Sequence, residues 1–242
     1  MTAATVRGDP PAGREWLLVA EQFGPTLQGE GPSAGTSAVF VRLSRCNLAC
    51  VWCDTPYTWD WARFDPHAES QRWTVPELAA WVLDRPAPLV VVTGGEPLLQ
   101  QQPLAALAER LTGAGRRVEV ETNGTRPPEQ RLVDTGAWFN VSAKLAHSGV
   151  PEHRRIVPDA LSALAGSGRA TFKFVVRERC DLDEIAVLVR RFGLAPVWVM
   201  PEGTTAETVV AGARALAEEV IARGWGLSLR LHVLLWGDAR GR

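Results

Sequence analysis

The stretch TSAVFVRLSRCNLACVWCDT, residues 36–55, joins a short apolar run to a dense group of cysteines. Residues 36–43 have the apolar and β-branched character of a strand. Three of the four cysteines follow at once, Cys46, Cys50 and Cys53, in the spacing C-x-x-x-C-x-x-C. In a reducing compartment, such clustering favours a metal site over a disulfide framework.

Three thiolates on one short loop match the needs of a cubane iron–sulfur cluster. They can bind three of its irons and leave the fourth iron without a protein ligand. A structural zinc ion would instead need a closed set of four ligands. Its fourth ligand would have to be Cys180, His67, His147, His153 or His232. The spacing favours iron–sulfur, and zinc stays as the alternative.

Downstream of the cysteines, strand-like and helix-like segments alternate. We expect strands at residues 36–43, 88–92, 117–121, 137–141, 170–176, 196–200 and 227–235. Helices are expected at residues 74–83, 103–111, 159–164, 182–192 and 206–223, with a short one after residue 125. This alternation predicts an α/β fold with a parallel sheet and helical crossovers. About six βα units favour a partial (β/α)6-type barrel.

Polar and glycine-rich segments follow several of the predicted strands. They are the cysteine loop, TGGEP (residues 93–97), ETNG (121–124), SAK (142–144) and MPEG (200–203). Ligands of parallel α/β sheets sit at the carboxyl ends of the strands. We therefore expect all of these segments to converge on one rim.

The composition is that of an ordinary globular protein, with 46% apolar and 22% charged residues in a chain of 242. A net charge of −1 gives no general attraction for nucleic acid or an anionic membrane. Residues 1–15 are read as a flexible lead-in without a secretory h-region, and residues 16–242 as a single domain. No segment suggests a membrane span, so the cytoplasm is the expected location.

The motifs resemble a known group of enzymes. C-x-x-x-C-x-aromatic-C and the segment GGEP (residues 94–97) are similar to the radical S-adenosylmethionine (SAM) superfamily. The segments TLQGEG (26–31), CDT (53–55) and ETNGT (121–125), together with Arg42, resemble the 7-carboxy-7-deazaguanine synthases. RLH (230–232) also resembles that family, less specifically.

This resemblance implies a lyase that converts 6-carboxy-5,6,7,8-tetrahydropterin to 7-carboxy-7-deazaguanine with loss of ammonia, on the route to queuosine and other 7-deazapurines. It implies a 4Fe–4S cluster, SAM and Mg²⁺ as cofactors. A 5′-deoxyadenosyl radical would remove a hydrogen from the pterin. An electron donor such as flavodoxin or ferredoxin and a homodimer are also implied.

The resemblance assigns roles residue by residue. The cluster ligands are Cys46, Cys50 and Cys53, and Thr55 is the magnesium ligand. The SAM contacts are Trp52, Gly95, Thr122, Ser142 and Lys144. The substrate contacts are Leu27, Gln28, Gly29, Arg42 and Thr93, and Arg42 suits the pterin carboxylate because its guanidinium can bind bidentately.

Other readings remain open at this point. A glycyl-radical-activating enzyme shares the cysteine spacing, and a zinc-binding interaction module would explain the cysteines without chemistry. No catalytic residue is assigned beyond the cluster and the cofactor. The roles of Glu121, Glu202, His232 and Cys180 are not assigned, and Ala143 stands where the family more usually has proline.

Overall fold

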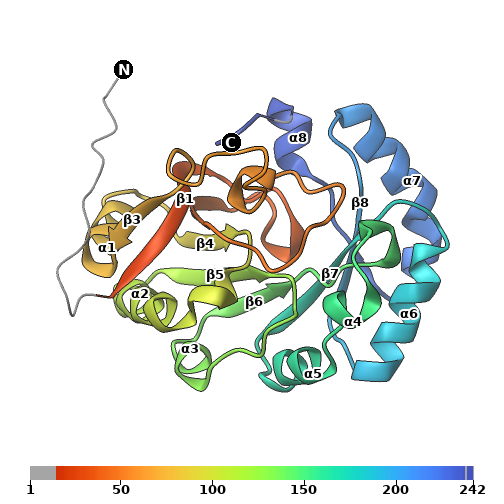
Figure 1. The fold of residues 1–242 in the computed structure, drawn as a ribbon. Helices are drawn as coiled ribbons and strands as arrows, with labels where there is room; N and C mark the ends of the chain where they lie inside the picture. Colours follow the sequence, from red (N-terminus) through yellow and green to blue (C-terminus); the bar gives the residue numbers. More distant parts are fainter. Residues whose placement is uncertain (1–14, 238, 242) are drawn as a thin grey trace.

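Nine strands form one sheet in the computed structural model, which describes residues 15–237 and 239–241 (Figure 1). The strand order is β3-β1-β2-β4-β5-β6-β7-β8-β9. The six central strands pair in parallel: β2 (Ser37–Leu43), β4 (Leu89–Gly94), β5 (Arg117–Thr122), β6 (Trp138–Val141), β7 (Ala170–Val176) and β8 (Val197–Pro201). The predicted fold class, with about six βα units, is confirmed. The lead-in predicted for the N-terminus lies, up to residue 14, outside the described residues.

One edge of the sheet differs from the prediction of an all-parallel sheet. Strand β1 (Trp16–Leu27) pairs antiparallel with β2, and β3 (Gln71–Thr74) pairs antiparallel with β1. The reason is the length of the connection. Residues 28–36 are too few for a crossover helix, whereas parallel neighbours need a dozen or more connecting residues.

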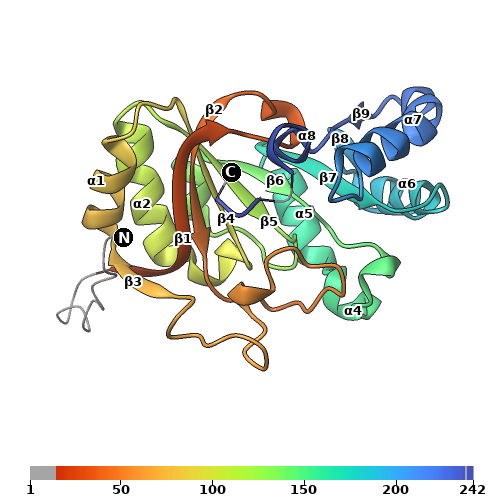
Figure 2. The same cartoon turned by 90° about the horizontal axis from the view of Figure 1, so that it is seen from above.

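The larger helices pack on the outside of the curved sheet, as Figures 1 and 2 show, whereas the last helix contributes His232 to the cavity described below. The helices are α1 (Val75–Leu83), α2 (Gln101–Gly113), α3 (Gln130–Asp134), α4 (Glu152–Arg155), α5 (Pro158–Gly166), α6 (Asp181–Phe192), α7 (Ala206–Ala222) and α8 (Leu231–Trp236). Short 3-10 turns cover Gly31–Ser33, Pro56–Thr58, Pro97–Gln100 and Ala146–Ser148. Helix α1 begins with the predicted capping box, in which Thr74 and Glu77 bind each other's backbone N–H. No helix in the described part of the chain is both long and apolar enough to span a bilayer.

The two faces of the sheet differ in polarity. Outward-facing side chains of the central strands belong to the large apolar core beneath the helices. On the inner face, Ala38, Phe40, Leu89 and Val91 form a small apolar cluster. Further along the sheet this face carries buried polar side chains instead: Glu119, Asn140, Thr171 and Lys173. A row of buried polar groups inside a sheet needs partners, and these partners build the site described below.

The strand predicted over residues 227–235 is wrong. Strand β9 covers only Gly226–Leu227, and the chain then forms helix α8. Beyond β9 the chain binds the TLQGEG loop through one side chain and one backbone group: the Gly31 N–H donates to the Ser228 hydroxyl (2.7 Å), and the Leu231 N–H donates to the Gly29 carbonyl (2.8 Å). These contacts draw the chain out of the sheet, although its alternating pattern also suits a strand.

Candidate active site

A cavity of about 510 Å³ opens at the carboxyl ends of the parallel strands. Every residue assigned above to the cluster, the cofactor, the substrate or magnesium lines it. The rim predicted from strand ends is therefore formed, because β2, β4, β5, β6 and β8 all deliver their following segments to this cavity. Cys180 lies outside it, exposed at the start of α6, and is not among the residues that the cavity brings together.

The cysteine loop follows β2 and holds three free, half-buried thiols. Burial raises the pKa of Cys46 to about 12 and also raises the pKa of Cys50. Polar hydrogens already point at the sulfurs: the Leu48 N–H lies 3.4 Å from the Cys46 Sγ, and the Trp59 indole N–H lies 3.3 Å from the Cys53 Sγ. Such donors suit thiolates that bind a metal, since a coordinating thiol is deprotonated.

The arrangement fits a cluster better than a single ion. Among the described residues, no three His, Cys, Asp or Glu side chains lie close enough to hold one metal ion. A zinc site would require four ligands around one point. A cubane binds each cysteine to a different iron, so its three sulfurs stay well apart. The loop therefore meets the requirement of the predicted 4Fe–4S cluster.

Gly94 and Gly95 allow the segment at the carboxyl end of β4 to pack directly against the cysteine loop. The Gly95 N–H donates to the Leu43 carbonyl (3.1 Å), and the Glu96 N–H donates to the Arg45 carbonyl (2.8 Å). A Cβ on Gly95 would overlap the Arg45 carbonyl and come within 2.9 Å of the Cys46 Cβ. Gly94 has φ +141°, a conformation that side chains rarely allow. Only glycine fits at this contact.

Glu96 is a functional residue that the sequence reasoning left unassigned. It is fully buried, and burial raises its pKa. Its carboxyl group accepts hydrogen bonds from the Thr122 hydroxyl (2.7 Å), the Asn123 N–H (2.7 Å) and the Leu98 N–H (2.9 Å). Glu96 thus ties the GGEP segment to the ETNG segment and holds Thr122 at the cavity.

Trp52, Ser142 and Lys144 lie together, as expected of residues that share one ligand. The Lys144 ammonium donates to the Ser142 hydroxyl (3.0 Å) and stands 5.3 Å from the centroid of the Trp52 ring. The Trp52 ring also stacks on His147, with the ring centroids 5.6 Å apart. The Trp52 indole N–H is buried without a partner among the described residues.

The predicted substrate contacts gather around Glu121. Its carboxylate accepts from the Thr93 hydroxyl (2.7 Å) and from the Gln28 amide (3.3 Å), and the Lys173 ammonium lies 3.9 Å away. Gly29 packs directly against the His232 ring, which leaves no room for a Cβ. Glu121, unassigned from sequence, therefore binds two of the five predicted substrate contacts, Thr93 and Gln28.

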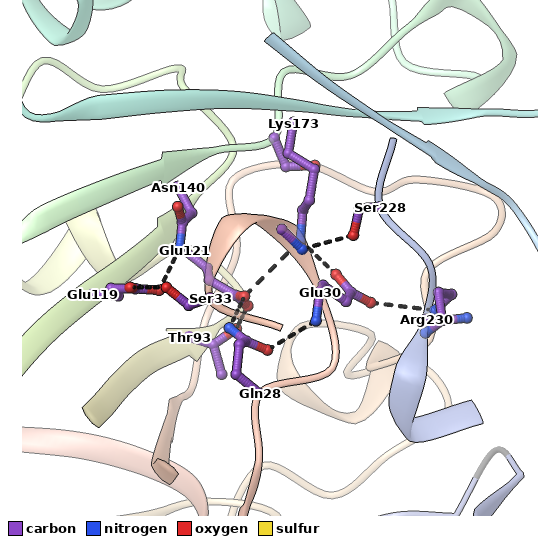
Figure 3. Close-up of polar contacts among 12 residues, drawn as sticks. Gln28, Glu30, Ser33, Thr93, Glu119, Glu121, Asn140, Lys173, Ser228 and Arg230 are labelled. Carbon is purple, nitrogen blue, oxygen red and sulfur yellow. Dashed lines mark hydrogen bonds and ion pairs between the residues drawn. The ribbon is translucent and has the colours of Figure 1, made fainter. Parts of the chain in front are cut away.

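A chain of buried charges forms the wall next to Glu121 (Figure 3). Lys173, on β7, makes an ion pair with Glu30. Glu30 also accepts from the Arg230 Nε (3.2 Å), and Arg230 donates through Nη2 to Asp54 (2.9 Å). Burial opposes ionisation of Glu30, but Lys173 and Arg230 hold its pKa well below the usual range. The sequence analysis missed Lys173, for which a lysine in the apolar strand ATFKFVV was the available signal, and it quoted Arg230 within RLH without giving it a role.

Of the remaining candidates, Thr55 and Glu202 line the cavity and Ala143 does not. The Thr55 hydroxyl lies 3.7 Å from the Cys53 Sγ, and the neighbouring Asp54 is engaged by Arg230. Glu202 faces Arg177, which donates to both of its carboxylate oxygens at 2.8 and 3.1 Å. Ala143 is buried, and the backbone of the preceding Ser142 is held by the Thr122 carbonyl (2.7 Å). The position that is more usually proline thus keeps an ordered backbone.

Residues 41–159 match the Radical SAM superfamily. The chain is 37% identical to the 7-carboxy-7-deazaguanine synthase of Pyrobaculum aerophilum, covering 90% of this chain and 94% of that one. It is 35% identical to the enzyme of that name from Rhodopirellula baltica, covering 99% and 94%. A crystal structure of QueE from Escherichia coli superposes with a TM-score of 0.72 at 26% identity, over 91% of this chain and 96% of that one.

The fold and the cysteine loop define a radical SAM enzyme, the class that uses a 4Fe–4S cluster and SAM. Within that class, the chain belongs to the 7-carboxy-7-deazaguanine synthase family. The resemblance drawn from the motifs is confirmed. The glycyl-radical-activating and zinc-module alternatives have no support in these matches. Streptococcus suis SuiB, at 12% identity and a TM-score of 0.53, shares the fold alone.

Proposed function

We propose that this protein converts 6-carboxy-5,6,7,8-tetrahydropterin to 7-carboxy-7-deazaguanine with loss of ammonia, in the biosynthesis of queuosine and other 7-deazapurines. The observation that carries the proposal is that one cavity combines the three-cysteine loop with Arg42 and the Glu121 group. The three-cysteine loop would hold the cluster that supplies radical chemistry. Arg42 and the Glu121 group offer the opposite charges that a carboxylated pterin requires.

The polar groups of the cavity fit the two ends of this substrate. The aminopyrimidine edge of a pterin presents N–H donors, and the Glu121 carboxylate can accept them alongside Thr93 and Gln28. The carboxylate of the substrate needs a cation, and the Arg42 guanidinium can bind it through two parallel hydrogen bonds. Opposite charges at the two ends would set the orientation of the ring.

Cys46, Cys50 and Cys53 would hold the cluster, and Trp52, Gly95, Thr122, Ser142 and Lys144 would line the SAM site. When bound, the cluster and SAM supply one-electron reduction and hydrogen abstraction, which no side chain provides. The residues of the chain bind, orient and enclose. Lys144 beside Trp52 can contact a ligand carboxylate, and the glycine pair brings backbone close to the cluster loop.

We further propose Thr55 as a magnesium ligand. Mg²⁺ prefers oxygen and commonly takes only one or two ligands from protein, leaving the rest to substrate and water. The Thr55 hydroxyl stands at the cavity between the cluster loop and the substrate residues. Asp54 is already paired with Arg230, which supports the Thr55 hydroxyl as the oxygen available to the ion.

The decisive experiment uses anaerobically reconstituted protein, reduced in the presence of SAM and 6-carboxytetrahydropterin, with and without Mg²⁺. We expect a 4Fe–4S absorption and EPR signature and release of 7-carboxy-7-deazaguanine, faster with Mg²⁺. Cys50→Ala should abolish product. Cleavage of SAM without the ring-contracted product would defeat the substrate assignment, and one zinc with no iron would defeat the whole reading.

Two further features are proposed from the family resemblance and not from the contacts above. A flavodoxin or ferredoxin would deliver the electron, and electron transfer from each can be measured directly. The active species would be a homodimer, which sedimentation of the holoenzyme tests. From the sequence itself we also propose a single domain spanning residues 16–242 and a cytoplasmic location.

A further inference from the structure

Glu21 lies on β1 behind the predicted carboxylate-binding arginine. Its side chain is only 16% exposed. The Oε2 atom accepts from the Arg42 Nε (3.2 Å) and from the Tyr57 hydroxyl (3.2 Å). The Oε1 atom accepts from the Arg240 Nε (3.2 Å). Burial raises the pKa of Tyr57 to about 12, so its hydroxyl remains a donor. The Glu21 carboxylate is therefore held by three donors.

The hydrogen bond from Arg42 to Glu21 determines which nitrogen atoms of the Arg42 guanidinium are free. Arg42 and Glu21 are cross-strand partners on the β1–β2 ladder, and the Phe23 ring lies 5.9 Å from the guanidinium. Within the described residues, the guanidinium makes its hydrogen bond through Nε alone. The two terminal nitrogens are left for a ligand in the cavity that Arg42 lines. Two parallel donors are the geometry that a carboxylate prefers.

Two other acidic side chains compete with a ligand for the Arg42 guanidinium. Asp54 and Glu121 are both near enough to attract it electrostatically. A guanidinium released from Glu21 would turn toward either of them, and its terminal nitrogens would then be occupied. Glu21 prevents this because it engages Nε, the nitrogen that a bidentate carboxylate does not need.

Arg240, near the C-terminal end of the chain, also binds Glu21. Arg240 donates through Nη2 to Glu69 (3.1 Å), in addition to its bond to Glu21. Its guanidinium lies 3.9 Å from the centroid of the Tyr57 ring. Arg240 thereby joins β1 to the loop that precedes β3. It also neutralises the Glu21 oxygen that faces away from Arg42.

We propose that Glu21 is a positioning residue that orients the two terminal nitrogens of Arg42 toward the substrate carboxylate, and that Arg240 holds Glu21 in place. The proposal rests on the proposed function and deepens it, because it assigns recognition of the carboxylate to three residues from opposite ends of the chain. Glu21 touches no substrate. It acts through Arg42.

The test compares two ligands on the holoenzyme with Glu21→Gln. The pair lost is a charge-assisted hydrogen bond, so we expect KM for 6-carboxytetrahydropterin to rise roughly tenfold to hundredfold with a much smaller change in kcat. Equilibrium binding of tetrahydropterin, which lacks the carboxyl group, should stay at the wild-type level. Arg240→Gln, made on a half-exposed side chain outside the core, should raise KM in the same sense by a smaller factor.

Glu69→Gln is the matched control, since it removes the other acid bound to Arg240 and leaves the Arg42–Glu21 pair intact. Its KM should match wild type. Equal losses for the carboxylated and the uncarboxylated pterin in Glu21→Gln would overturn the proposal, as would an unchanged KM in both Glu21→Gln and Arg240→Gln. Wild-type enzyme that forms no 7-carboxy-7-deazaguanine would instead refute the proposed function, whatever the variants bind.

Discussion

Replacing Lys173 by methionine tests the buried charges beside the candidate substrate site. The lysine side chain is 7% exposed and lies between Glu30 and Glu121. Methionine keeps most of the volume of the lysine stem and removes the charge. Glu30 then keeps Arg230 as its cation, while the hydrogen bonds of Glu121 within the described residues come from the neutral donors Thr93 and Gln28.

The expected loss of stability follows from the partners left behind. Removing one member of a buried ion pair costs about 3–5 kcal/mol, and the remaining Arg230 points to the lower end of that range. In a chain of this size, each kcal/mol shifts Tm by about 2–4 °C. We therefore expect Tm of the holoenzyme at pH 7 to fall by about 6–12 °C.

The dependence on pH separates this electrostatic cause from a packing defect. The pKa of Glu30 is lowered in the folded wild type, so its pairing stabilises the fold above the ordinary carboxyl pKa and is lost as pH falls through the folded pKa. Without Lys173 the pKa of Glu30 should rise, because burial then dominates. Protonation of Glu30 would remove the uncompensated buried charge in the variant. The difference in Tm between the variant and wild type should therefore become smaller as the pH falls from 7 to 5.

The assay is anaerobic thermal unfolding of reconstituted protein at several pH values, with iron content measured on the same samples. The double variant Lys173→Met with Glu30→Gln is the control, and it should recover part of the loss because the uncompensated carboxylate is gone. A Tm deficit that grows on acidification, or a double variant whose loss equals the sum of both single variants, would refute the electrostatic reasoning.

Three other outcomes can be checked directly. Gly95→Ala should cost about 1–3 kcal/mol or more through overpacking against Arg45, and iron and sulfide analysis after reconstitution should show reduced cluster content. Glu96→Ala should lower Tm more than Glu96→Gln, because it leaves three buried donors without an acceptor at roughly 1–3 kcal/mol each. Thr55→Val should remove the stimulation of product formation by Mg²⁺ while leaving SAM binding intact, as measured by steady-state rates and equilibrium dialysis.

Much of the fold was predictable because its signals are local. The segments 170–176 and 182–192 match β7 and α6 almost residue for residue, since apolar period and turn residues act within a few positions. The Thr74–Glu77 capping box is equally local. Strand β1 and the end of the chain were harder: residues 227–235 alternate like a strand, yet their backbone is bound by the distant Gly29–Gly31 segment.

By itself, the sequence determined the cysteine loop, the glycine pair beside it, the order of strands and helices, and the rim on which their polar ends meet. These properties follow from spacing and periodicity along the chain. Only the tertiary structure decided which charges face each other. Glu30 meets Lys173 and Arg230 across 143 and 200 residues of sequence, and Glu21 meets Arg240 across 219. No local pattern specifies such pairs, because they arise where packing removes water from side chains that the fold brings together.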